Sequence, residues 1–174
     1  MVNRVFLCVL FAGLLFSGTA FGLQLTSPAF DEGEEIPLEY TGKGENISPP
    51  LSWNGVPEGT KSFVLIMEDP DAPLGTWIHW VVYDIPSVST SLEKDISQDA
   101  ALPDGTKQGL NSFRWTGYGG PNPPPGKPHR YVFSLYAVDM KLANIPPASN
   151  MGRVLRAIQG HILGWARLTG TFGR

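Results

Sequence analysis

Four apolar runs along the chain predict its main strands. Residues 62–67, 79–85 and 131–138 are nearly continuous apolar runs, rich in branched and aromatic side chains, as in strands that are buried on both faces. Residues 162–172 alternate instead, which places Ala166 and Leu168 on one face and Arg167 on the other. Three shorter runs are also candidate strands: residues 24–26, 37–40 and 51–53.

One late helix is predicted by an apolar stripe at helical spacing. Between Met151 and Ile158, apolar residues recur at i, i+3, i+4 and i+7, just before Gly160. Ser149 or Asn150 can cap the first turn of this helix. Many strands followed by a single helix predict a mainly β fold, a sandwich or Greek key.

Composition narrows the class of protein further. The 174 residues fit one domain, and a hydrophobic content of 42% excludes a disordered chain. The 20 glycines and 16 prolines suit short strands joined by many turns. The formal charge is −3, so the chain lacks the excess of basic residues that is typical of nucleic-acid-binding proteins.

The N-terminal segment has the pattern of a secretory signal peptide. Arg4 precedes the apolar run 5–16, which is too short to span a bilayer, and small residues follow it. Cleavage is expected before Leu23, or alternatively before Phe21. The predicted organisation is a signal peptide over 1–22 and one domain over 23–174, in the periplasm or secreted. An uncleaved N-terminal anchor is the alternative.

Cysteine usage limits the chemistry of the mature chain. Cys8 is the one cysteine of the sequence, and it lies inside the predicted signal peptide. After cleavage the chain has no disulfide, no thiolate nucleophile and no cysteine ligand for a metal.

Polar residues that are able to bind a ligand or to take part in a reaction gather at the ends of the predicted strands. Asp69 and Asp71 flank Pro70 directly after the first buried run. Trp77 and His79 open the next run, on the same face of a strand by period-two geometry.

A glycine- and proline-rich loop, residues 117–126, leads into the third run. Gly119, Gly120 and Pro121 belong to this loop, where exposed main-chain N–H groups can cup an anion. His129 and Tyr131 follow it on one face of a strand. Each feature alone has a structural explanation, as a solvated turn, a packed histidine or a rigid loop. Their coincidence at strand ends favours a site.

The sequence resembles the phosphatidylethanolamine-binding protein (PEBP) family, and more specifically its bacterial Raf kinase inhibitor-like branch. The likeness extends from Leu25 to Phe172. It is carried by five stretches in the family's order: residues 44–53 (GENISPPLSW), 69–73 (DPDAP), 77–79 (WIH), 117–125 (GYGGPNPPP) and 129–131 (HRY).

This resemblance implies a large antiparallel sheet packed on a smaller one, with a pocket for a phosphate-like anion at one end. It places the following residues in the pocket: Asp69, Asp71, Trp77, His79, Gly119, Pro121, His129 and Tyr131. In eukaryotic members a C-terminal helix can cover the pocket, and we expect it to be missing because this chain stops at Arg174. Arg114 stands where many bacterial relatives have glycine, and it either adds positive charge near the site or faces solvent.

Elementary chemistry assigns roles within this pocket. We expect Asp69 to orient His79 or His129, since a carboxylate can hold an imidazole in its charged form. The N–H groups of Gly119 and Gly120 and the Tyr131 hydroxyl would then donate to the anion. Asp71 would favour a zwitterion such as phosphoethanolamine over sulfate.

These expectations predict a non-catalytic binding protein without a cofactor, which regulates a partner protein or simply holds its ligand. The first alternative is an inhibitor of a protease or kinase that acts through the loops at the pocket rim. The second is a hydrolase or a zinc enzyme, which the absence of a Gly-x-Ser-x-Gly or HExxH motif disfavours. A homodimer is left open.

Overall fold

The structure, a computed structural model, describes residues 22–174, so the predicted signal peptide lies outside the described residues except for Gly22. Within residues 22–174, the fold consists of eight strands, one 3-10 helix and one α-helix. In chain order they are β1 (Gln24–Thr26), η1 (Leu38–Tyr40), β2 (Leu51–Asn54), β3 (Ser62–Asp69), β4 (Trp77–Pro86), β5 (Ser91–Leu92), β6 (Lys107–Gln108), β7 (His129–Val138), α1 (Met151–Ile158) and β8 (Ile162–Phe172).

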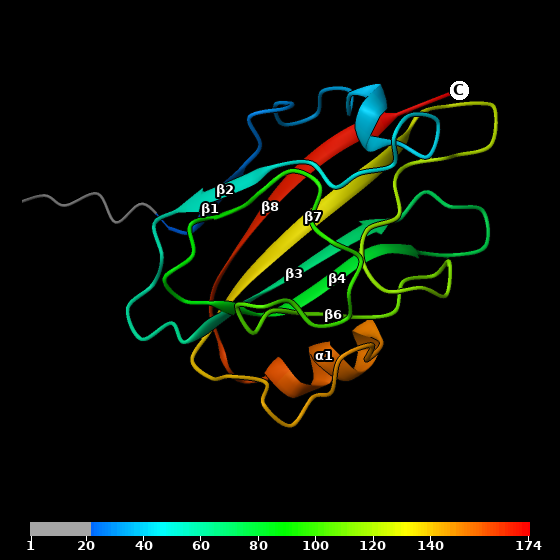
Figure 1. Cartoon of the computed structure of the whole chain (residues 1–174). Helices are drawn as coiled ribbons and strands as arrows, with labels where there is room; N and C mark the ends of the chain where they lie inside the picture. The colour runs from blue at the N-terminus through cyan, green and yellow to red at the C-terminus, as the bar shows by residue number, and fades with distance from the viewer. Residues whose placement is uncertain (1–21) are drawn as a thin grey trace, which may run out of the picture.

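The strands form two antiparallel sheets. The larger has the order β6-β4-β3-β7-β8, and the smaller has the order β1-β2-β5. The smaller sheet lies over one face of the larger, and α1 lies on the opposite side (Figure 1). The predicted mainly β architecture, with a large sheet, a smaller sheet and one late helix, is confirmed.

The large sheet is apolar on both faces because each face has a cover. Toward the small sheet, Leu65, Met67 and Phe133 join a core cluster with Leu51 and Trp53. Toward the helix, a second cluster contains these buried side chains: Val64, Ile66, Val81, Tyr83, Val138, Leu142, Val154 and Ile158. The small sheet packs on one face of β3 and the helix side packs on the other. Side chains on both faces of this strand are therefore buried, which explains its continuous apolar run.

The helix begins where the sequence predicts. Asn150 is the N-cap, and its side chain accepts a hydrogen bond of 2.9 Å from the Arg153 amide. Val154 and Ile158 of its apolar stripe are fully buried. Within residues 22–174, no helix is long and apolar enough to cross a bilayer.

Two features of the fold differ from the sequence-based expectation. The candidate strand at residues 37–40 is wrong: this segment forms η1, where the Tyr40 amide bonds the Pro37 carbonyl and the Thr41 amide bonds Leu38. The strands β5 and β6 were not predicted, since two residues are too few to show a period.

Candidate functional site

Three neighbouring strands bring the predicted site residues to one end of the large sheet. Strand β3 ends at Asp69, and its antiparallel partners β4 and β7 begin at Trp77 and His129. These ends meet on the right in Figure 1, beside the loops that follow β3 and precede β7. They enclose a pocket of about 320 Å³. We call it the histidine pocket; its lining residues are Asp69, Ala72, Pro73, Leu74, Trp77, His79, Phe113, Asn122, Pro123, Pro124, His129 and Tyr131.

A β-bulge positions His79. Opposite β3, Met67 pairs with Trp80 and Glu68 with Ile78, so His79 is the extra residue on β4. Bulges of this kind re-aim one side chain and recur beside binding sites. The His79 ring is buried, and it meets the Tyr131 ring edge-on at a centroid distance of 5.1 Å.

Asp69 fixes the second imidazole. Its Oδ2 lies 2.7 Å from Nδ1 of His129, and its Oδ1 accepts a 2.8 Å hydrogen bond from the Asp71 amide. Both oxygens of this buried carboxylate are therefore occupied. Since a carboxylate accepts, Nδ1 of His129 carries the proton and Nε2 is left for a ligand.

His79 is oriented by main chain instead of by Asp69. Its Nδ1 bonds the carbonyl oxygen of Gly119, and because a carbonyl only accepts, Nδ1 is the protonated nitrogen. Burial lowers the pKa of His79 below its ordinary 6.5, although the Gly119 carbonyl and the Asp69 carboxylate act in the opposite direction. At neutral pH this ring is uncharged, with Nε2 as an acceptor.

Tyr131 supplies an unpaired hydroxyl. The side chain is fully buried, and within residues 22–174 its oxygen has no hydrogen-bond partner. Burial, with Asp69 and Asp71 nearby, raises the pKa of this phenol well above its ordinary 10, so the O–H remains protonated. A buried hydroxyl without a partner costs about 1–3 kcal/mol, which a ligand can recover.

Asp71 does not line the histidine pocket. Its carboxylate accepts three hydrogen bonds from Arg130: from the amide (2.9 Å), Nε (2.9 Å) and Nη2 (2.7 Å). These bonds lower the pKa of Asp71 to about 2. The expectation that Asp71 selects a zwitterion is wrong, because this charge is already paired outside the pocket.

The main-chain cradle expected from the glycine-rich loop is also absent from the described residues. The Gly119 amide donates to the His79 carbonyl at 3.0 Å, and the Gly120 amide donates to Asn46 Oδ1 at 2.7 Å. Pro121 accepts from the Gly42 amide through its carbonyl. These bonds hold the loop in place, and the N–H groups of Gly119 and Gly120 are therefore not available to an anion.

An aromatic wall was not predicted. Phe113 lies edge-on to both Trp77 and His79, at 5.4 Å in each case, and Trp115 stacks on its outer side at 4.8 Å. No periodic pattern marks Phe113, which lies in the long segment between β6 and β7. The prolines of the two neighbouring loops, which the sequence motifs did contain, complete the apolar lining.

Two further expectations concern charge and metal. Arg114 is exposed, has a φ of 73° and does not line the histidine pocket, so it faces solvent. In the part of the chain that the structure describes, no three histidine, cysteine, aspartate or glutamate residues are placed to hold a metal ion.

Comparison with known proteins places the chain and its fold in a family. Residues 26–173 match the family model for phosphatidylethanolamine-binding protein. The chain belongs to the PEBP family. A UPF0098 protein of Methanothermobacter thermautotrophicus is 49% identical over 152 residues, which cover 87% of this chain and 99% of that protein. The UPF0098 protein YbcL of Escherichia coli is 42% identical, over 83% of this chain and 82% of its own length.

Solved structures agree. CT736 of Chlamydia trachomatis, described as a PEBP homolog, has a TM-score of 0.80 at 40% identity and covers 88% of this chain and 98% of its own. The structure of E. coli YbcL, described as a member of the mammalian PEBP family, has a TM-score of 0.82 at 36% identity, with 88% and 99% covered. The resemblance seen in the sequence is thus confirmed for almost the whole described chain.

Proposed function

We propose that this PEBP-family chain is an exported binding protein whose histidine pocket holds a small phosphate-like anion without converting it. One observation carries the proposal: His79 and His129 line the same pocket, and Nδ1 of each ring is hydrogen-bonded to another group of the protein. Nε2 of both rings is then left for one ligand. The unpaired Tyr131 hydroxyl supports a third contact.

The protonation of these groups favours a particular form of anion. The Tyr131 hydroxyl offers a donor, and neutral His79 offers an acceptor at Nε2. A phosphate monoester that keeps one proton satisfies both, since it has acceptor oxygens and one O–H. A free monoester and the headgroup of a phospholipid share this chemistry.

The lining supports binding over catalysis. Among the residues that line the pocket, none is a serine, threonine or cysteine that could act as a nucleophile beside the histidines. Apolar rings and prolines fill most of the wall. A histidine and a carboxylate without a nucleophile make an incomplete hydrolase.

Calorimetry with methyl phosphate tests the proposal. Removing the His129 ring in His129→Ala should weaken binding by about tenfold or more, because one charge-assisted contact is lost. His161→Ala is the matched control, since His161 also pairs with an aspartate, Asp139 Oδ1 at 2.8 Å, outside the pocket. Equal affinity in wild type, variant and control would refute the assignment.

Two further ligands separate the sources of the phosphate. Phosphoethanolamine should bind no more tightly than methyl phosphate, because both carboxylates near the pocket are already paired. Sedimentation with phosphatidylethanolamine vesicles then asks whether the pocket reaches a headgroup at a membrane. If wild type sediments with the vesicles and His129→Ala does not, the ligand is a lipid headgroup. If the protein binds methyl phosphate but does not sediment with the vesicles, the ligand is a free anion.

A regulatory role toward a partner protein is the second candidate. Leu74, on the loop after β3, is 96% exposed at the pocket rim, beside Pro123 and Pro124. An apolar side chain so fully exposed next to a ligand pocket is suited to contact with another protein. In a pull-down from the extracytoplasmic fraction, Leu74→Ser should lose a partner that wild type and the control His161→Ala both retain.

A further inference from the structure

Strand β8 leaves part of its outer edge unpaired. It pairs with β7 along one edge and is the last strand of the large sheet. On the other edge, Gly33 and Ile36 donate to the carbonyls of Thr169 and Thr171, at 2.7 and 2.8 Å. The Thr171 amide donates back to Glu34 at 2.8 Å. Residues 33–36 therefore cover only the C-terminal part of this edge.

The next positions along the strand are open. Main-chain groups alternate between the two edges of a strand with a period of two, so those of Trp165 and Arg167 face the same way as those of Thr169. In the described part of the chain, no hydrogen bond reaches the main chain of either residue on this edge. Trp165 is 57% exposed, and the Arg167 guanidinium lies over its ring at 5.1 Å.

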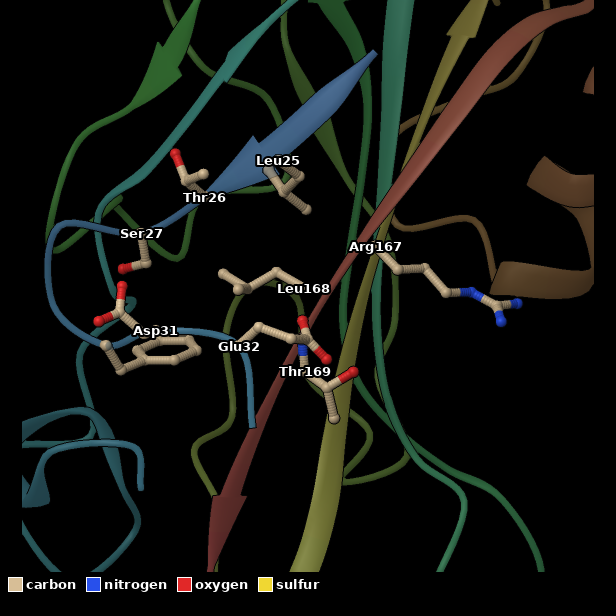
Figure 2. A pocket seen from close by; sticks show the side chains of 9 residues that line it. Leu25, Thr26, Ser27, Asp31, Glu32, Arg167, Leu168 and Thr169 are labelled. Carbon is tan, nitrogen blue, oxygen red and sulfur yellow. The ribbon is translucent and has the colours of Figure 1, made fainter. Parts of the chain in front are cut away.

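A groove of about 730 Å³ lies beside this edge, between the two sheets. We call it the edge groove; its lining residues are Leu25, Thr26, Ser27, Phe30, Asp31, Glu32, Arg167, Leu168 and Thr169. Figure 2 shows Leu25 of β1 and Leu168 of β8 around the hollow, with Asp31 on the loop after β1, while the Arg167 side chain extends away from it.

Two carboxylates give the edge groove its charge. Glu32 Oε2 accepts a 2.8 Å hydrogen bond from the Thr169 amide, in the place where the carbonyl of a neighbouring strand would sit. Asp31 makes no ion pair or side-chain hydrogen bond within residues 22–174. The groove thus combines an apolar floor, a free acidic group and an unpaired strand edge.

We propose that this edge binds an extended peptide strand of a partner protein, with an apolar side chain in the edge groove and a lysine or arginine two residues away facing Asp31. An added strand would bond the free main-chain groups of Trp165 and Arg167. Its alternate side chains would point between the sheets, toward Leu25 and Leu168. The charge of Asp31 and Glu32 selects a basic partner over an acidic one.

The probe is a fluorescein-labelled peptide of seven residues that alternates threonine with valine and lysine. Fluorescence anisotropy should report binding, and hydrogen exchange should slow at the amides of Trp165 and Arg167. The same peptide with glutamate in place of lysine should bind at least about tenfold more weakly.

Two variants at one position separate main chain from side chain. Arg167→Pro removes the amide that faces the open edge, a place where strands tolerate proline, and should lose peptide binding. Arg167→Ala keeps the amide and should retain it. If Arg167→Pro does not fold, Asp31→Lys at an exposed position decides instead, and it should weaken binding of the lysine peptide.

With peptide present, any of the following results would overturn the proposal: no peptide binding, peptide binding without slower exchange at Trp165 and Arg167, or equal binding by Arg167→Pro and Arg167→Ala. Slower exchange at these amides that grows with protein concentration in the absence of peptide would also overturn it. That result would assign the edge to a second copy of the chain.

Discussion

At the scale of single residues, the candidate site depends on which atoms are already paired. One carboxylate oxygen of Asp69 pairs with His129, and the other accepts a hydrogen bond from the Asp71 amide in the turn that follows β3. Asp71, two residues later, is paired outside the pocket with Arg130. Two carboxylates that look equivalent in the sequence therefore have different roles: one orients an imidazole, and the other anchors a loop.

The lowered pKa of His79 predicts a pH dependence. In the free protein the neutral ring is favoured, so this group stabilises the fold above pH 6.5, and the stabilisation is lost as pH falls through the lowered pKa. A bound anion favours the charged ring. Methyl sulfate, whose charge is constant, should therefore bind more tightly as pH falls from about 7.5 to about 5.5.

Calorimetry in two buffers of different ionisation enthalpy measures the proton uptake that accompanies this binding. His79→Gln should abolish the part of the uptake that belongs to this ring. Binding of methyl sulfate that neither tightens at lower pH nor takes up protons would contradict the neutral state assigned to His79.

The Asp71–Arg130 pair predicts a change in stability without a change in binding. The pKa of Asp71 is lowered from 3.8 to about 2, so the pair stabilises the fold above about pH 4 and ceases to do so as pH falls through about 2. Asp71→Asn should lower the melting temperature slightly at neutral pH, since the pair is partly exposed.

In thermal melts, the difference between Asp71→Asn and wild type should shrink as pH falls from 4 toward 2. Methyl phosphate should bind both proteins equally at pH 7. A large loss of affinity in Asp71→Asn would place this carboxylate in the pocket, against the structure.

At the scale of elements, hydrophobic periodicity predicted each strand and helix that is long enough to show a repeating pattern. The buried runs of β3, β4 and β7, the alternation of β8 and the stripe of α1 all lie where expected. Segment 37–40 misled because Leu38 and Tyr40 alternate by chance; Leu38 is 59% exposed. Contacts between segments that are distant in the sequence could not be predicted from periodicity, and the hydrogen bond from the Gly120 amide to Asn46 is an example. The expected anion cradle failed for that reason.

The loop before β7 makes a test at this scale. A Cβ on Gly119 would lie 2.6 Å from the Phe113 ring, so Gly119→Ala should displace the aromatic wall and the carbonyl that orients His79. Methyl phosphate affinity should fall by about tenfold or more. Gly152→Ala in α1 is the control, because a Cβ there has space and should slightly stabilise the helix. Equal affinity in both variants would contradict the role of Gly119.

At the scale of the whole molecule, the sandwich separates two surfaces. The histidine pocket lies where β3, β4 and β7 meet at one end, and the edge groove lies along β8 and β1. Neither pocket shares a lining residue with the other. The proposed anion and the proposed peptide would therefore occupy separate sites.

Export is a prediction for the complete chain. When the full-length gene product is made in a bacterium, the mature protein should be found outside the cytoplasm. Mass spectrometry should give an N-terminus at Leu23, or at Phe21. Retention of residues 1–20 on a membrane-bound protein would favour the uncleaved anchor and contradict the prediction of a signal peptide.

The central claim is that two imidazoles of one pocket bind the same anion. Nitrogen-15 NMR of the three histidines during titration with methyl phosphate tests it most directly. The account predicts that the Nε2 signals of His79 and His129 shift together with one dissociation constant, while those of His161 do not move. Shifts at only one of the two pocket histidines, or equal shifts at all three, would contradict it.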